Sequence, residues 1–191
     1  MTVNKFYSCL NTGDILGAVL AIDGISDLNN SYSKLSYSTP LDFGVQHNAF
    51  PVVELLLERG ANIDQVSYSE NTPLMSAVVH LHTDMIDFLL EKGANTDVPV
   101  PDGATPLKYA IDWNDVGIAR KLLDAHADVD REDARRWSML HRATRQGNLE
   151  MIKLLIEYGA KIHSMTIDGD TCLDIARSEG YVDILEYLSQ L

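Results

Sequence analysis

The chain has 191 residues, of which 46% are hydrophobic and 23% charged, so it can fill a folded core but is too short for a large multidomain enzyme. Acidic residues outnumber basic ones by 28 to 15, and the formal charge of −13 opposes general affinity for nucleic acid or an anionic membrane. The same charge favours a basic protein partner. The longest apolar run, residues 15–22, is far shorter than the roughly 18 residues of a membrane span.

The two cysteines, Cys9 and Cys172, lie near opposite ends of the chain and match no metal-ligand spacing. We therefore expect reduced thiols, as found in a reducing compartment. We expect the protein to be cytoplasmic, or to act in a host cytosol if it is a secreted effector.

Two apolar segments open the chain. Residues 6–10 and 13–22 predict a first, degenerate pair of helices, because the second segment aligns with residues 147–156 further along. The loop that leads from there to Thr39 is 2 residues longer than the matching loop before Thr171. Its serine, asparagine and tyrosine content favours an exposed finger.

A 33-residue period governs the rest of the chain. Five triplets of the form Thr-Pro-Leu or a close variant begin at residues 39, 72, 105, 138 and 171. A tiny residue follows five positions after each start, which favours close approach of two helices, and a leucine-rich run comes next. Four of the units then end on Gly-Ala or, once, His126-Ala127. Such regularity predicts an array of repeats.

Each unit contains the signals for two helices. The Thr or Ser that opens the triplet is a helix N-cap, and the proline after it suits the first helical position. The second apolar run has helical spacing and stops at a glycine suited to the left-handed C′ position, where His126 replaces it once. A pair of this size cannot bury its own apolar stripe, so we expect neighbouring pairs to stack.

These residues resemble the ankyrin repeat family, whose 33-residue unit contains Thr-Pro-Leu-His-x-Ala and a late Gly-Ala pair. Residues 105–110 and 138–143 show the motif well. The resemblance implies an all-α ankyrin-repeat solenoid of about six helix-turn-helix units with connecting finger loops. It would form a single domain over 1–191, with a degenerate N-terminal capping repeat (1–37), four internal repeats (38–168) and a C-terminal capping repeat (169–191).

One histidine, His141, keeps the family motif position; Asp42, Met75, Lys108 and Asp174 replace it elsewhere. The resemblance implies a side-chain bridge between adjacent loops at His141. The absence of histidine puts that bridge in doubt at the other four positions.

The resemblance also implies a binding face, a concave groove lined by the loop tips before each triplet and the exposed side of each first helix. Large aromatics and arginines on such a surface are typical of interface hot spots. The alternative is that the aromatic rings pack on the neighbouring repeat and only stabilise the stack. By repeat register, the candidate partner-binding residues are Trp113, Trp137, Tyr68, Tyr109, His47, His80, Asp102, Asp112, Arg135, Arg142, Arg145 and Gln146.

Residues 131–145 contain five basic and two acidic residues, a local excess of +3 in an acidic chain. These arginines could grip an acidic loop or a C-terminal carboxylate of a partner, because arginine offers a planar bidentate fork. Equally, they could pair with nearby acids on a solvated face. Sequence reasoning leaves the two interpretations open.

The sequence contains no glycine-rich phosphate loop, nucleophile elbow, CxxC or HExxH spacing, so we expect no catalytic residue, no cofactor and no metal. Of six histidines, only His80 and His82 are close, and a gap of two puts them on different sides of a helix. We expect a non-catalytic protein-binding adaptor or inhibitor that is monomeric when free. Alternatives are an immunity protein or antitoxin against a basic toxin, a secreted effector that captures a host protein, and a self-assembling structural array.

Overall fold

The structure, a computed structural model, describes residues 2–32, 37–101 and 103–191. Within these ranges all regular secondary structure is α-helical, apart from one isolated antiparallel bridge between Glu132 and Ser138. The chain divides into two compact units, Met1–Asp102 and Gly103–Leu191. Each unit contains three pairs of short helices, as the repeat pattern predicts.

In unit 1, the second helices α2 and α4 contact each other, and the first helices α3 and α5 do the same. The helix α1 begins four residues before the predicted segment and packs along α2. The six helices are α1 (Thr2–Asn11), α2 (Ile15–Ile22), α3 (Pro40–Gln46), α4 (Phe50–Glu58), α5 (Pro73–Val79) and α6 (Thr83–Glu91).

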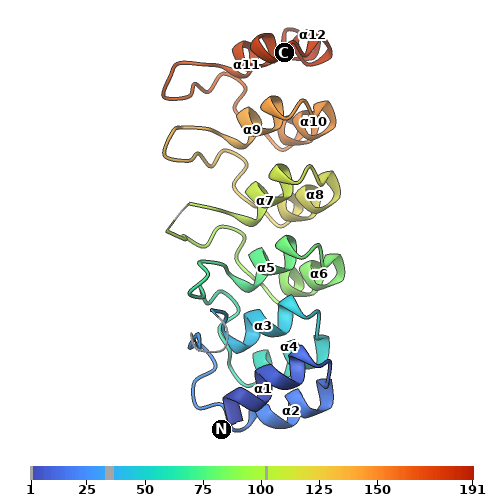
Figure 1. The fold of residues 1–191 in the computed structure, drawn as a ribbon. Helices are drawn as coiled ribbons and strands as arrows, with labels where there is room; N and C mark the ends of the chain where they lie inside the picture. The colour runs from blue at the N-terminus through green and yellow to red at the C-terminus, as the bar shows by residue number, and fades with distance from the viewer. Residues whose placement is uncertain (1, 33–36, 102) are drawn as a thin grey trace. The chain divides into compact units, whose positions relative to one another are not determined.

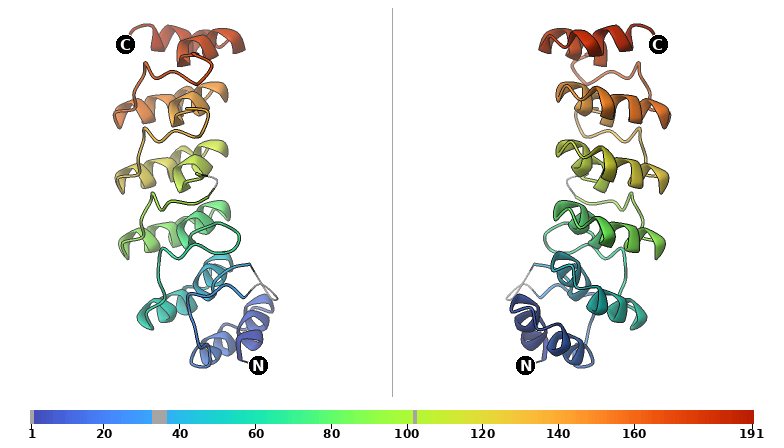
Figure 2. Two further views of the ribbon diagram at one scale, coloured as in Figure 1. Left: turned by 90° about the vertical axis from the view of Figure 1, so that its left-hand side faces the viewer. Right: turned by 90° about the vertical axis from the view of Figure 1, so that its right-hand side faces the viewer.

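In unit 2, the first helices α7, α9 and α11 lie in a row, and α8 contacts α10 behind them. The loops before α9 and α11 extend away from the helices on the side of that row (Figure 1). Figure 2 shows the three pairs of this unit as successive layers. The six helices are α7 (Pro106–Asp112), α8 (Val116–Asp124), α9 (Met139–Arg145), α10 (Leu149–Glu157), α11 (Cys172–Glu179) and α12 (Val182–Leu188).

The predicted N-caps are confirmed at all five triplets. In each, the Thr or Ser hydroxyl oxygen accepts a hydrogen bond from the backbone N–H three residues on, at 3.1–3.4 Å. The two first helices that lack the proline have a second bond instead: His141 and Asp174 each accept from the backbone N–H of their own N-cap. Reciprocal capping therefore supports these two helix starts.

The small residue in each first helix marks the close approach of its second helix, as predicted. Ala77, Ala110, Ala143 and Ala176 are fully buried. At the glycine of the series, Gly44, an added Cβ would lie 3.3 Å from both Val52 and Val53. A larger side chain at these positions would force the paired helices apart.

Left-handed backbone recurs three times in each internal repeat, whereas the sequence predicts one such position. The predicted one, after each second helix, is confirmed at Gly60, Gly93 and Gly159 and also at His126, whose φ is 66°. A second series follows the first helices and a third lies in the finger loops. The second series is Gly13, Asn48, Leu81, Asn114, Gly147 and Gly180, and the third is Glu70, Gly103, Arg136 and Gly169.

The longest helix that the structure describes, α1, has 10 residues, so none of the described helices has the length and apolarity to cross a bilayer. The cores of both units consist mainly of aliphatic side chains from the paired helices, joined in unit 1 by the aromatic rings of Phe6, Tyr7 and Phe43. In unit 2, Leu122 of α8 and Leu155 of α10 are fully buried at equivalent repeat positions.

Candidate functional site

A surface cavity of about 540 Å³ opens in unit 2 where α7, α9 and the loop before α9 meet. We call it the Trp137 cavity. Six of its seven described lining residues were candidates from the repeat register; Asp133 was not. The described lining residues are Asp112, Asp133, Arg135, Trp137, Arg142, Arg145 and Gln146.

Helix α9 and its caps position four of these side chains. Trp137 immediately precedes the N-cap Ser138, and Gln146 is the C-cap residue. Arg142 lies three residues before Arg145, so the two side chains leave neighbouring turns on one face. The amide nitrogen of Gln146 donates to the backbone oxygen of Asp112, at 3.3 Å, which connects this end of α9 to the end of α7.

Asp133 organises the loop, and sequence reasoning missed it. Its Oδ1 accepts from the backbone N–H groups of Arg135 and Trp137, at 2.8 and 3.0 Å. Its Oδ2 lies 2.6 Å from Nη2 of Arg142. The sequence signal that could have identified Asp133 is its place at the start of a short turn. An aspartate side chain at such a position often accepts hydrogen bonds from backbone N–H groups two or more residues further on.

Both tryptophans lie outside the core. Trp137 is half-buried, with its ring centroid 6.0 Å from that of His141 and 5.4 Å from the guanidinium of Arg145. Trp113 caps the end of α7, is 44% exposed and lies 5.7 Å from the Tyr109 ring. Trp113 and Tyr109 are not among the described lining residues of the Trp137 cavity.

Within the ranges that the structure describes, three of the five arginines in residues 131–145 form ion pairs with nearby acids, among them Arg136 with Glu132 at 3.6 Å. Arg142 lies between Asp133 and Asp112, the latter at 3.7 Å, and Arg135 pairs with Asp168 at 3.0 Å. These pairs are compatible with the interpretation in which the arginines neutralise nearby acids, and partner binding by Arg135 and Arg142 stays a prediction. Arg145 differs: in the described part of the chain it has no carboxylate within 4.0 Å.

The remaining candidates lie elsewhere. In unit 1, Tyr68 is exposed and lines a smaller cavity of about 220 Å³, shared with residues 29–31 and 65–67. His47 and His80 are exposed, and each Nδ1 lies 2.9 Å from a backbone oxygen of its own helix. Asp102 lies outside the described residues.

The expectation for His80 and His82 was wrong in its geometry. His80 ends α5 and His82 is the cap residue before α6, so the two do not share a helix. The left-handed residue Leu81 turns the chain between them, and their rings stack with centroids 5.6 Å apart. Among the described residues, no group of three or more His, Cys, Asp or Glu side chains is placed to hold a metal ion.

Two buried ionisable groups outside the cavity occupy the family's histidine position. Burial lowers the pKa of His141, whose Nε2 lies 3.2 Å from the backbone oxygen of Ser164 in the next finger loop. The bridge predicted at His141 is thus present. Burial raises the pKa of Asp42, and its Oδ2 accepts from the amide of Gln46 in the same helix, at 3.2 Å.

Short helix pairs joined by finger loops at a 33-residue period define an α-helical repeat protein. The family model for ankyrin repeats (3 copies) matches residues 41–133 and 121–191. The chain belongs to the ankyrin repeat family. Ankyrin repeats generally mediate protein–protein interaction.

Curated relatives match over single segments. The chain is 54% identical to mouse protein phosphatase 1 regulatory subunit 27 over 52 residues, which is 27% of this chain and 34% of that protein. It is 35% identical to ankyrin repeat domain-containing protein 37 of Xenopus tropicalis over 69 residues, 36% of this chain and 42% of that protein. It is 45% identical to the human Notch-regulated ankyrin repeat-containing protein over 49 residues, 26% and 43% of the two chains. The chain thus spans less than half the length of each.

Proposed function

We propose that this protein is a non-catalytic binding module, an adaptor or inhibitor, that holds a protein partner on the α7–α9 face of unit 2. The observation that carries the proposal is the Trp137 cavity. An indole ring, an exposed amide and an arginine that has no ion pair within the described part of the chain meet there on a surface that does not need them for its core. Arginine and tryptophan are the residue types enriched among interface hot spots.

The cavity is preorganised for binding. Asp133 fixes the backbone of Arg135 and Trp137 and pairs with Arg142, so the loop before α9 is already held in its conformation. A partner that docks on a rigid surface loses less conformational freedom than one that must order a loop. The acidic character of the chain, −13 overall, would attract a basic partner from a distance.

The name of one relative supports an adaptor role, since it is a regulatory subunit of a phosphatase. The match covers about a third of that protein. Both cysteines are buried and free, which supports a site of action in a reducing compartment such as the cytosol.

The test is affinity capture with the wild type beside the Trp113→Ala/Trp137→Ala double variant. Partner affinity should fall by about tenfold or more, because central aromatic hot spots contribute on the order of 2 kcal/mol each. Helical circular dichroism should stay unchanged. Loss of helical signal instead would assign the indole rings to folding.

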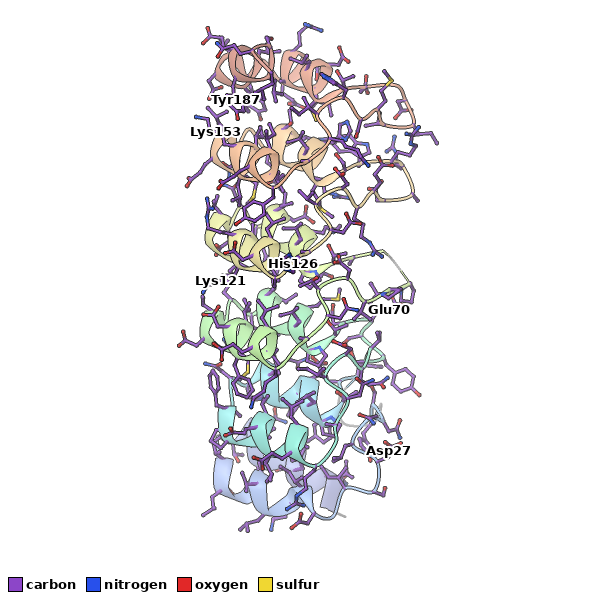
Figure 3. All side chains as sticks on the ribbon, turned by 180° about the vertical axis from the view of Figure 1, so that it is seen from behind. Asp27, Glu70, Lys121, His126, Lys153 and Tyr187 are labelled. Carbon is purple, nitrogen blue, oxygen red and sulfur yellow. The ribbon has the colours of Figure 1, made fainter. Side chains whose placement is uncertain are left out.

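The matched control is Tyr187→Ala, an aromatic residue of a second helix. Tyr187 of α12 lies beside Lys153 of α10, whose Nζ is 5.3 Å from the ring centroid, and neither residue lines the Trp137 cavity (Figure 3). This variant should retain every protein that the wild type retains. Equal loss of partners in the control would contradict the assignment of binding to the α7–α9 face.

A second candidate function, self-assembly, is favoured by the exposed side of α2. Leu16 and Leu20 are 70% and 69% exposed, one helical turn apart. Light scattering after size-exclusion chromatography tests it: a dimer that Leu20→Lys abolishes would support self-assembly. A concentration-independent monomer would leave partner binding as the proposal.

A further inference from the structure

We infer that the Trp137 cavity recognises a carboxylate of the partner, the side chain of an aspartate or glutamate in an internal segment, through Arg145. The inference rests on the proposed function and names the chemistry of the partner at that site. The three arginines of the cavity differ in their ion pairs.

Two of the three arginines are already neutralised. Arg142 is held by Asp133 at 2.6 Å and is the least exposed of the three, and Arg135 is paired with Asp168 at 3.0 Å. Arg145 lies over the Trp137 ring, at 5.4 Å, and none of the carboxylates in the described residues comes within 4.0 Å of it. The guanidinium of Arg145 is thus the cation of the cavity that is left for a ligand.

The charge of the lining selects the ligand. With the ion-pair partners of the lining included, the three arginines and Lys108, which lies 2.8 Å from Asp112, stand against Asp112, Asp133 and Asp168, so the site carries one net positive charge. A carboxylate matches that single charge. A phosphate group, which carries nearly two negative charges at neutral pH, would leave one of them facing the two aspartates. The balance therefore favours a carboxylate over a phosphorylated side chain.

The indole of Trp137 improves Arg145 as a carboxylate binder. An arginine held against an aromatic face keeps its in-plane N–H groups free, and these form the fork that matches a carboxylate with two hydrogen bonds. The backbone of Trp137 is itself fixed, because its N–H is bonded to Asp133. The ring also offers apolar surface to the aliphatic stem of a bound acidic side chain or to its neighbour.

The surroundings favour a side chain over a chain terminus. Sites that capture a C-terminal carboxylate use clusters of free backbone N–H groups. Here the N–H groups of Arg135 and Trp137 both donate to Asp133. Arg145 and Gln146 are exposed at the edge of the cavity, so an extended segment can pass across them and present one side chain.

An acidic contact residue is compatible with attraction of a basic partner. Charge steering acts over the whole protein surface, whereas contacts between exposed charges are screened beyond about 8–10 Å at physiological salt. The overall charge of −13 thus governs approach, and Arg145 governs the local fit.

The test selects peptides from a displayed random library on the immobilised full-length wild-type chain, and separately on Arg145→Met and on the control Arg120→Met. Arg120 lies on α8, outside the cavity lining. Peptides from the wild type and the control should share an enriched Asp or Glu beside an apolar residue, and Arg145→Met should lose that enrichment. Selected peptides should bind Arg145→Met about tenfold to a hundredfold more weakly, as expected for a charged hydrogen-bonded pair.

Synthetic forms of a selected peptide, amidated at the C-terminus, separate the sources of charge. Changing its Glu to Gln should weaken binding as much as Arg145→Met does. A Gln peptide with a free C-terminal carboxylate should not restore binding, and a phosphoserine in place of Glu should bind more weakly than Glu. Restoration by the free terminus, or tighter binding of the phosphoserine form, would overturn the inference.

The outcomes also separate this inference from the proposed function. Peptides that need Trp137 but show no acidic preference would overturn the carboxylate inference alone. A library that yields no peptide sensitive to Trp137→Ala would count against the α7–α9 face as a binding site, and the inference would fall with it.

Discussion

His141 in helix α9 connects to Ser164 in the next finger loop, with 3.2 Å between Nε2 and the backbone oxygen. On its other side Nδ1 lies 3.2 Å from the backbone nitrogen of Ser138, which can only donate. The ring is therefore neutral, with its proton on Nε2. A second proton would remove the acceptor that caps α9.

Replacing His141 with Gln should cost about 1–3 kcal/mol of stability, because buried partners lose their hydrogen bonds. The pKa of His141 is lowered by burial below its ordinary value of 6.5. The unfolded chain then binds the proton more readily, so this contribution is complete above pH 6.5 and is lost as the pH falls below it. Urea unfolding at about pH 7 and pH 5 should show a smaller acid loss in the variant than in the wild type. Equal losses would contradict the assignment.

Asp42 should have the opposite pH dependence. Burial raises its pKa above the ordinary value of 3.8, and hydrogen bonds from Gln46 and nearby serines only partly oppose this. The folded state then binds the proton more readily, so stability falls as the pH rises above 3.8 toward the raised pKa. Asp42→Asn should be more stable than the wild type at neutral pH, with the difference shrinking toward pH 3.8. A variant that is less stable at neutral pH would show that the hydrogen bonds outweigh burial.

His126→Gly should stabilise the protein by about 0.5–1 kcal/mol. A non-glycine residue in the left-handed region costs about 1–2 kcal/mol, and glycine avoids this cost but loses more backbone conformational entropy on folding. His126 has φ 66° and is exposed, so little packing is lost. The reverse change, Gly159→His, should destabilise by a similar amount, because an added Cβ at Gly159 meets no atom within 4 Å and only the backbone is strained. Chemical denaturation measures both; changes of the same sign would refute the explanation.

Leu122→Ala and Leu155→Ala should each cost about 2–5 kcal/mol, the usual range for a fully buried leucine. Leu20→Ala is the control, since its side chain is mostly exposed and should change stability by no more than about 0.5 kcal/mol. Equilibrium urea unfolding compares the three. A small cost at Leu155 would mean that the second helices do not form the core.

Much of the architecture was predictable because its signals are local. Thr39 and Ser138 cap helices by bonds to residues three positions on, and Gly60 ends a helix through its own backbone freedom. Such rules need no knowledge of distant contacts. The same register placed six of the residues around the Trp137 cavity, although partner binding by them stays a prediction.

The misses concern residues whose role depends on a neighbour. Leu81 and Arg136 adopt left-handed backbone although their residue types do not favour it, because the turns of the repeat require that conformation. The left-handed turn at Leu81 is also the reason why His80 and His82 belong to different helices. Aspartate is common in loops, so the residue type of Asp133 gave no specific signal. Its three hydrogen-bond partners are brought to it only by the folded conformation of the loop.

Local chemistry thus sets the 33-residue period, the helix starts and the choice of candidate face, since each depends on residues within a few positions of one another. The pairing of charges does not follow from such local chemistry. Arg135 meets Asp168 in the next finger loop and Arg142 meets Asp112 in the preceding pair, whereas Arg145 meets an indole. Only the packing of successive repeats brings such residues within range, because Coulomb attraction and hydrogen bonding act over a few ångströms. Which arginine lacks an ion pair among the described residues is therefore a property of the tertiary structure.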